Sequence, residues 1–295
     1  MRTVVLTSPE LTELVAIPAG TSSQGSDDFY AEETPRRQQD VAAFQLERHP
    51  VTNRQFARFV ADTGWLTTAE RPIPDDIAGI PAELRAPGSL VFTPTDGPVD
   101  LLRWDLWWRW VPGATWRHPH GPGSHITGKE DHPVVQVSKE DAEAYAQWAG
   151  RRLPTETEWE HAVTNGQHPY AWGSEFTPDG QLMANTFQGD FPYRNTGAKG
   201  WFGTSPIGTF PPTQHGLVDM IGNVWEWTAS VFSAGQQPEP SCCTTSESRD
   251  LETQFVVKGG SHLCNPAYCA RYRPAARQPQ SPDSATTHLG FRCAL

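Results

Sequence analysis

Two cysteines five positions apart are the residues best suited to chemistry in this chain of 295 residues. Cys264 and Cys269 lie within GGSHLCNPAYCARYRPAAR, the stretch from Gly259 to Arg277. Pro266 between them argues against a plain helix, and on a helix an i, i+5 spacing would separate the two side chains. A bent loop could instead turn both sulfurs toward one point.

The donor set limits which metal such a loop could hold. Two thiolates fall short of the four ligands of a tetrahedral zinc site, whereas two soft sulfurs suit a soft ion of low coordination number, for which Cu(I) is the biological example. His262 could add a ligand, although a lone histidine is more often a hydrogen-bonding loop residue. Inert buried thiols remain the alternative, and the arginines at 271, 273 and 277 would favour thiolates if their heads come close.

A second candidate site lies in HGLVDMIGNVWEWT. Asp219 and Glu226 flank a turn at Gly222 and Asn223, and together they could offer hard oxygens to one cation. Calcium accepts such mixtures of carboxylate and backbone carbonyl. The alternative is that both acids are solvated or cap the turn.

Composition excludes several functions. A net charge of -11 makes nucleic acid an unfavourable partner, and no apolar run is long enough to span a membrane. The first twenty residues lack the regions of a secretory signal, so a cytoplasmic location is expected. Five cysteines, an odd number, then favour metal or redox use over a disulfide framework.

The pattern of the chain predicts short elements within one domain. Helices are expected where Ser or Thr can cap a first turn, as Thr52 with Gln55 and Thr155 with Glu158 do in capping boxes. Their expected ranges are 52–64, 138–150 and 155–166. A first short strand and a turn are expected over 15–24 and another strand around 41–46, followed later by short strands and tight turns.

Tryptophans are concentrated in one irregular stretch. Five of the twelve fall between Trp104 and Trp116, inside a segment rich in Pro and Gly. We expect them to form a core patch, because large apolar rings need a packed environment. A binding surface is the alternative, since long ordered loops are often functional.

Taken together, five motifs resemble the formylglycine-generating enzyme family. They are RRLPTETEWEHA, ANTFQGDFP, GNVWEWT, GGSHLCNPAYCARYRPAAR and TTHLGFRC, and the resemblance extends over nearly the whole chain. It implies one α+β domain over residues 1–295, related to C-type lectins and low in regular secondary structure. It also implies a monomeric oxidase that converts the cysteine of a CxPxR motif in an unfolded sulfatase to Cα-formylglycine with dioxygen.

The resemblance assigns roles to residues of this chain. In that family the paired cysteines bind Cu(I), and the matching residues here are Cys264 and Cys269. Residues matching the oxygen pocket are Ser261, Tyr268 and Trp227. Residues matching the substrate groove are Ser124 and His288, although Gly123 replaces the usual acidic residue before Ser124.

The resemblance also implies structural calcium. One site matches Asp219 and Glu226 with the backbone carbonyls of Gly222 and Val224. A second would fall on Asn185, Thr186 and Trp201, but Lys199 replaces its acidic ligand with an ammonium that would repel the ion. The positions that carry disulfide partners in secreted relatives are Val163 and Pro274 here, so Cys293 is expected to be a buried free thiol.

Two other classes stay open. One is a non-catalytic, lectin-like binding module that kept the fold but would not need both cysteines. The other is a non-haem-iron sulfoxide synthase, which would carry an HxxxHxE pattern in an extra helical domain; the sequence shows neither.

Overall fold

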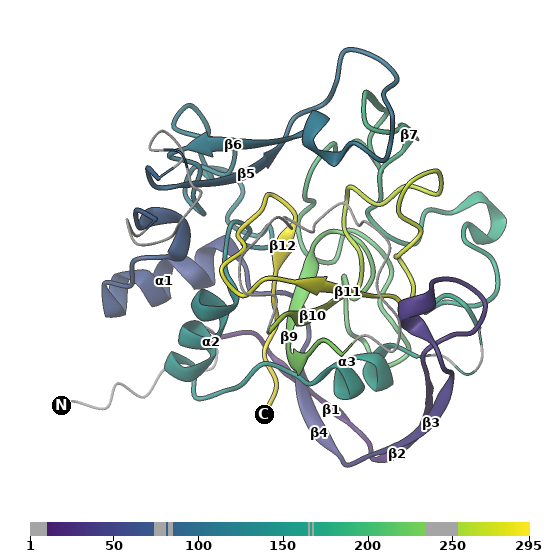
Figure 1. The fold of residues 1–295 in the computed structure, drawn as a ribbon. Coiled ribbons are helices and arrows are strands. Elements are labelled where there is room, and N and C mark those ends of the chain that lie inside the picture. The colour runs from purple at the N-terminus through teal and green to yellow at the C-terminus, as the bar shows by residue number, and fades with distance from the viewer. Residues whose placement is uncertain (1–10, 74–80, 82–84, 165, 167, 234–252) are drawn as a thin grey trace.

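The computed structural model describes residues 11–73, 81, 85–164, 166, 168–233 and 253–295 (Figure 1). The elements are short and joined by long connections. The α-helices are α1 (Asn53–Thr63), α2 (Lys139–Trp148) and α3 (Glu156–Val163). The 3-10 helices are η2 (Ala31–Glu33), η3 (Thr68–Glu70), η5 (Trp104–Leu106) and η6 (Pro178–Gly180). The strands are β1 (Leu14–Ile17), β2 (Gly20–Gln24), β3 (Arg37–Val41), β4 (Phe44–Glu47), β5 (Gly88–Phe92), β6 (Trp108–Pro112), β7 (Gly189–Asp190), β8 (Arg194–Asn195), β9 (Trp225–Val231), β10 (Phe255–Lys258), β11 (Arg277–Gln280) and β12 (Leu289–Gly290).

A four-stranded sheet in the order β11-β10-β9-β12 lies at the centre of the molecule (Figure 1). Its pairs are antiparallel except β12 with β9, which is parallel. The hairpin β5-β6 lies above this sheet in the view of Figure 1, and the pairs β1-β4 and β2-β3 lie below it. The connection from β10 to β11 contains both cysteines of the specific motif, so the central sheet fixes the two ends of that loop.

The three predicted helices are confirmed, with their capping chemistry. Thr52 accepts from the Gln55 N–H and the Gln55 side chain accepts from the Thr52 N–H, while Gly64 at φ 69° ends α1 in the left-handed conformation. The third helix is shorter than expected, because its C-cap is Thr164, an extended residue. Local sequence therefore decides where these helices begin better than where they end.

The predicted strands over 15–24 and 41–46 are wrong in their boundaries. The first range contains two strands, β1 and β2, which are interrupted at Pro18, a residue without a backbone N–H to donate. The second range straddles the end of β3 and the start of β4. Because β1 pairs with β4 and β2 with β3, the four strands form two successive segments of one antiparallel ribbon.

Two apolar clusters meet at the cysteines. The larger cluster runs from the first strand to the C-terminus and includes Cys264 and Cys269. The smaller cluster contains Trp107 and Trp108, and Tyr268 packs against both clusters. The expected core role of the tryptophan-rich stretch is thus confirmed for its buried members, and that core adjoins the cysteine loop.

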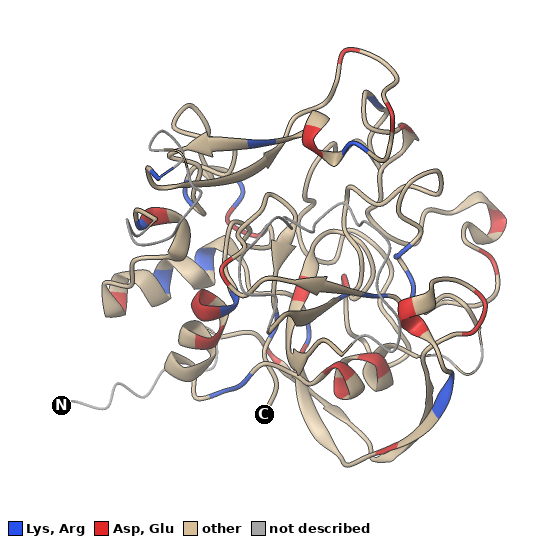
Figure 2. Ribbon diagram, in the orientation of Figure 1, with Lys and Arg blue, Asp and Glu red and all other residues tan. Residues whose placement is uncertain are grey.

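Charged residues penetrate the interior as ion pairs between elements far apart in sequence. Figure 2 shows acidic residues along α2 and α3. Glu160 of α3 accepts from the buried Lys258 Nζ of β10 at 2.9 Å, and Glu226 of β9 pairs with the buried Arg292 at 2.7 Å. In the described part of the chain, no helix is long and apolar enough to cross a membrane.

Candidate functional site

The loop from 259 to 276, which we call the cysteine loop, is bent at both ends. Gly259 and Gly260 have φ values of 97° and 71°, and a Cβ on Gly260 would lie 2.8 Å from the Arg271 carbonyl oxygen. Only glycine allows the two ends of the loop, around Gly260 and Arg271, to approach so closely. Inside it, the Cys264 N–H donates to Ser261 O at 3.0 Å and the Cys269 N–H donates to Asn265 O at 2.7 Å. The prediction of a bent, non-helical loop is confirmed.

The two sulfurs of this loop point at one another. Cys264 Sγ and Cys269 Sγ are 3.1 Å apart, and both residues are buried, with 1% exposure. The Ser261 N–H points at Cys264 Sγ from 3.4 Å, a contact that favours a thiolate at this sulfur. The spacing of the two cysteines in sequence therefore becomes a pair of adjacent soft donors.

A small cavity of about 10 Å³ adjoins the Cys264 sulfur. That volume is close to the least that can hold one water-sized molecule. Its walls are mostly aromatic and apolar, and they suit a small, weakly polar guest better than water. The lining residues are Trp107, Trp108, Phe191, Trp225, Ser261, Leu263, Cys264, Tyr268 and His288.

Ring contacts hold the walls of this cavity rigidly. Tyr268 stacks on Phe191 with centroids 4.7 Å apart and meets Trp107 edge to face at 5.3 Å. The His288 ring lies 4.9 Å from that of Trp108. The structure thus brings His288, from the C-terminal part of the chain, together with Ser261, Cys264 and Tyr268 of the cysteine loop.

Trp227 lies elsewhere, which corrects the expectation that it lines the oxygen pocket. Its indole N–H donates to Val137 O at 3.1 Å, deep in the larger cluster. Trp225 supplies the wall instead. Both tryptophans are on the same face of β9, but they are two residues, or about 7 Å, apart along the strand. The motif GNVWEWT alone cannot distinguish them.

Sequence reasoning also missed Trp107, Trp108 and Phe191 as cavity walls. The two tryptophans come from the tryptophan-rich stretch, where a core patch was expected; their rings are buried in the smaller cluster and also line the cavity. Phe191 lies within ANTFQGDFP, one of the five motifs shared with the family. That shared motif could have indicated a role for Phe191 near the site. Leu263 could have been found from its place beside Cys264.

Ser124 is placed in a turn and does not line this cavity. Its hydroxyl donates to Gly121 O at 2.8 Å and accepts from the His120 N–H at 2.8 Å. The neighbouring Gly123 has open space where a side chain would stand. The structure therefore leaves the predicted groove role of Ser124 without a contact to the sulfur site.

His262 is held as a structural residue. Its Nδ1 lies 2.7 Å from Asn223 O, and because a carbonyl only accepts, Nδ1 carries the proton. Burial lowers the pKa of His262 to about 3, so the ring is neutral at physiological pH. The hydrogen-bonding alternative for this histidine agrees with the structure.

The first expected calcium site offers one well-suited acid and one that is already paired. The Asp219 carboxyl accepts from the Gly208 N–H at 2.6 Å, and burial raises its pKa to about 6. A bound cation would stabilise the ionised form of this buried group. Glu226 instead accepts from Arg292 through both oxygens and from the Trp159 indole at 2.8 Å. Asp219 is therefore suited to bind a cation, whereas the oxygens of Glu226 are already occupied by hydrogen bonds.

The second expected calcium site fits less well. Asn185 Oδ1 is buried without a hydrogen-bond partner among the described residues, which suits a ligand. However, the carbonyl oxygens of Thr186 and Trp201 each accept a hydrogen bond already. The Lys199 Nζ donates to Thr209 O at 3.0 Å, which leaves an ammonium where an acid was needed.

The remaining cysteines have no visible role in this site. Cys293 is fully buried and is a free thiol, which confirms that expectation, and burial raises the pKa of its thiol well above the ordinary value. Val163, at an expected disulfide position, is buried in the larger cluster. Cys242 and Cys243 lie outside the described residues.

Comparisons with known proteins agree with this geometry. The family model described as "Sulfatase-modifying factor enzyme 1-like domain" matches residues 3–295. The chain is 56% identical to the formylglycine-generating enzyme of Mycobacterium tuberculosis over 96% of this chain and 97% of that one. It is 36% identical to the inactive C-alpha-formylglycine-generating enzyme 2 of Bos taurus over 99% and 91%.

Among solved structures, PvdO from Pseudomonas aeruginosa matches with a TM-score of 0.57 and 22% identity, over 97% of this chain and 94% of that one. At that identity the likeness shows the fold alone, an α+β fold low in regular secondary structure. The family match and the high identity to active enzymes carry the functional conclusion. The chain belongs to the sulfatase-modifying factor enzyme 1-like family and, within it, to the formylglycine-generating oxidoreductases.

Proposed function

We propose that the chain oxidises the cysteine of a CxPxR motif in an unfolded sulfatase to Cα-formylglycine, using dioxygen and Cu(I) held by Cys264 and Cys269. The observation that carries the proposal is the pair of buried sulfurs, 3.1 Å apart, beside a small aromatic cavity. Two adjacent soft donors suit a soft monovalent ion. The cavity suits dioxygen, which is small and apolar.

Copper fits the donor set better than the other metals considered. Within the described residues no group of three or more His, Cys, Asp or Glu side chains could hold a metal, so neither a tetrahedral zinc site nor an iron site with three protein ligands is offered there. Bound Cu(I) would supply the one-electron chemistry with dioxygen that protein side chains lack.

The chain's own residues would prepare the reaction. The Ser261 N–H stabilises negative charge on Cys264, which favours the thiolate over the thiol. Tyr268 and Trp225 present apolar ring faces that exclude water from the cavity. His288, fixed by a 2.7 Å contact between its Nδ1 and Thr286 Oγ1, stands at the same cavity as a polar group.

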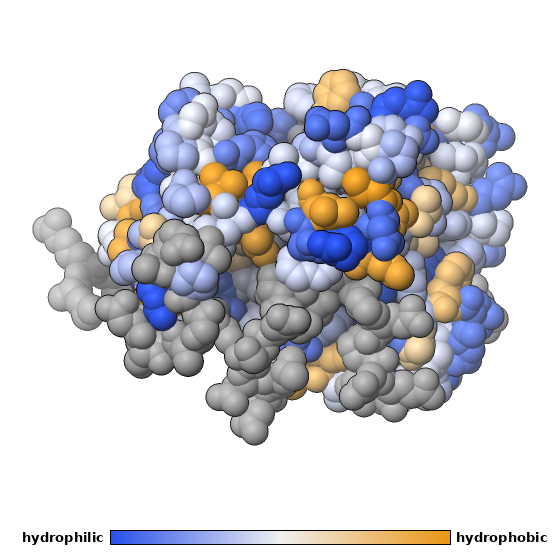
Figure 3. All heavy atoms as spheres, turned by 45° about the horizontal axis from the view of Figure 1, so that its top comes forward, coloured by the Kyte–Doolittle hydropathy of each residue, from blue (hydrophilic) through white to orange (hydrophobic). Residues whose placement is uncertain are grey.

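One face of the molecule has a mixed apolar and polar surface that would suit an extended peptide. Figure 3 brings the top of Figure 1 forward and shows apolar patches near the middle of that face with hydrophilic residues between them. An extended peptide, whose side chains alternate, could contact both kinds of surface. We include Ser124 and His288 in the proposed groove, the former through its surface turn and the latter at the cavity.

Calcium is proposed as a structural ion at Asp219, with the carbonyl oxygens of Gly222 and Val224 and a share of Glu226. The support is the buried Asp219 carboxylate with its raised pKa. The second calcium site is not part of the proposal, because the Lys199 ammonium would repel the ion. The proposal also includes a single domain over 1–295, which the family match over 3–295 and the core running from first strand to last support. We propose further that this domain acts as a monomer.

Electron balance sets the conditions of the assay. Turning the thiol-bearing carbon into an aldehyde, with loss of hydrogen sulfide, releases two electrons, whereas reducing dioxygen to water takes four. An external thiol must supply the other two. The assay therefore contains reduced, Cu(I)-loaded protein, dithiothreitol, air and a CxPxR peptide, and mass spectrometry follows the mass loss expected when the cysteine becomes an aldehyde.

Cys269→Ser keeps the fold but removes one sulfur, so the peptide should stay unmodified. Cys293→Ser is the matched control, because it changes a buried thiol away from the cavity. Full activity in Cys269→Ser, or equal rates with and without copper, would reject the proposal. The alternative class, a non-catalytic module, is motivated by the 36% identity to an inactive relative; it predicts no aldehyde at any copper loading.

A further inference from the structure

A segment near the N-terminus forms hydrogen bonds and ion pairs with the cysteine loop. Residues 26–36, which we call the strap, contain η2 and lie between β2 and β3. In Figure 1 the purple helical turn of the strap lies beside the yellow-green loops at the right. Four consecutive or nearly consecutive strap residues contact the loop: Phe29, Tyr30, Glu32 and Glu33.

The strap fixes the peptide unit that follows Cys269. The Ala270 N–H donates to the Tyr30 hydroxyl at 3.0 Å. The Ala270 carbonyl accepts from Arg273 Nε at 2.9 Å. Both polar groups of Ala270 are thus used, and one of their two partners belongs to the strap itself.

The other partner, Arg273, is also held by the strap. Its guanidinium forms a two-point pair with Glu33 at 2.8 and 2.5 Å, and side-chain exposure is 1% for Arg273 and 0% for Glu33. The Phe29 ring covers the guanidinium at 3.6 Å. A guanidinium fixed at two points and covered on one face has little freedom to release Ala270.

The ring of Tyr30 is positioned by the loop in return. Arg271 stacks over it at 3.8 Å and pairs with Glu32 at 2.6 Å, again with little exposure. The charges of Cys269 and Glu32 more than offset burial, so the pKa of Arg271 is raised. The contact between strap and loop is therefore mutual and lies immediately beside the second sulfur.

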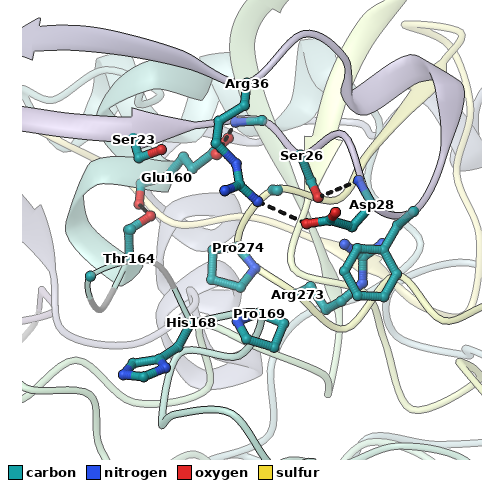
Figure 4. Close-up of a pocket in the computed structure, with 14 residues that line it drawn as sticks. Ser23, Ser26, Asp28, Arg36, Glu160, Thr164, His168, Pro169, Arg273 and Pro274 are labelled. Carbon is teal, nitrogen blue, oxygen red and sulfur yellow. Dashed lines mark hydrogen bonds and ion pairs between the residues drawn. The ribbon is translucent and has the colours of Figure 1, made fainter.

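Packing alone does not hold the strap in place. A cavity of about 200 Å³ lies beside it, lined by Ser26, Asp28 and Arg36 of the strap and by Arg273 and Pro274 of the loop (Figure 4). The Arg36 guanidinium pairs with Asp28 at 2.9 Å. On this flank the strap has few packing partners, so the hydrogen bonds and ion pairs to the cysteine loop add to the β2-β3 pairing and the Ser26 N–H to Glu33 O bond in setting its position.

We infer that Tyr30 and Glu33 are positioning residues for copper binding: through Ala270 they keep Cys269 Sγ facing Cys264 Sγ, so that both sulfurs can bind one ion. The inference rests on the proposed copper chemistry. A loop without these bonds would sample other geometries, and the apparent affinity would fall in proportion to the competent fraction.

Two measurements on the full chain test this inference with Tyr30→Phe, which keeps the ring on Arg271 but removes the acceptor. The first is hydrogen exchange of the copper-free protein, in which the Ala270 amide should exchange faster. The second is Cu(I) affinity, by anaerobic competition with a chromophoric chelator, which should fall about tenfold if a tenth of the loop stays competent. Glu33→Gln should weaken binding in the same direction.

Asp28→Asn is the matched control, because it changes an exposed strap residue that does not touch the loop. It should leave both the exchange rate and the affinity unchanged. Wild-type exchange and affinity in a folded Tyr30→Phe variant would overturn the inference. If wild type itself fails to bind Cu(I), the proposed function fails, and the exchange of Ala270 still decides whether the strap positions the loop.

Discussion

Arg292 makes the contacts whose loss the structure predicts most sharply. Its Nε and Nη2 donate to the two oxygens of Glu226 at 2.7 and 2.8 Å, and its remaining N–H groups reach three backbone carbonyls at 2.9, 3.0 and 3.2 Å. Both partners have side-chain exposures of 0%. Arg292 therefore neutralises a carboxylate that has no access to water.

Arg292→Met should cost about 3–5 kcal/mol of unfolding free energy, because it leaves the Glu226 charge buried and unpaired. The Trp159 indole, at 2.8 Å, remains as a neutral donor and is too weak to compensate a full charge. Against a total stability of about 5–15 kcal/mol, this loss is a large fraction. The variant should unfold at a much lower urea concentration than wild type.

The effect is measured by urea unfolding in EDTA, which prevents calcium from neutralising the unpaired Glu226 carboxylate. Arg54→Met is the matched control, since Arg54 pairs with Asp131 at the surface with 64% exposure on each side; it should cost less than about 1 kcal/mol. The double variant Arg292→Met with Glu226→Gln should regain much of the loss, because the charge is gone. A single variant within about 1 kcal/mol of wild type, or a double variant no better than the single, would refute this reasoning.

Three further predictions follow from the site. In EDTA, wild type should gain stability relative to Asp219→Asn as the pH falls from 7 to 5, because the raised pKa of about 6 makes the ionised form costly; millimolar calcium should abolish this trend in thermal unfolding. Trp225→Phe and Trp227→Phe should lose similar stability, since both rings are buried, but only the former should raise the oxygen concentration for half-maximal rate. Lys199→Asp should increase the number of calcium ions bound, measured by calorimetry, because Asn185 Oδ1 already lacks a partner.

Local signals predicted local structure. The capping boxes at Thr52 and Thr155 depend on residues three positions apart, so the sequence contains everything that the helix starts require. The ribbon from β1 to β4 was missed because its breaks are set by pairing between strands, as Pro18 lies opposite the gap between β3 and β4. Pairing across some twenty residues leaves no local pattern.

The candidate site shows the same division. The pairing of Cys264 and Cys269 could be predicted because both sulfurs and the bend between them lie in one short loop. The aromatic cavity brings together β6, β9 and the segment around Phe191, and no spacing in the sequence indicates that these rings meet. The choice of Trp225 over Trp227 depends on where β9 begins, which is a property of the assembled sheet.

The arginines of the cysteine motif show why the motif is not a metal site by itself. Each of them is paired with a distant acid: Arg271 with Glu32, Arg273 with Glu33 and Arg277 with Glu156. Although burial lowers it, the pKa of Arg271 is raised by the charges of both Cys269 and Glu32, so this arginine interacts with the sulfur as well as with its acid. Because buried ion pairs of this kind can fix geometry more than they contribute net stability, we infer that these pairs orient the loop through the acids of the strap and of α3.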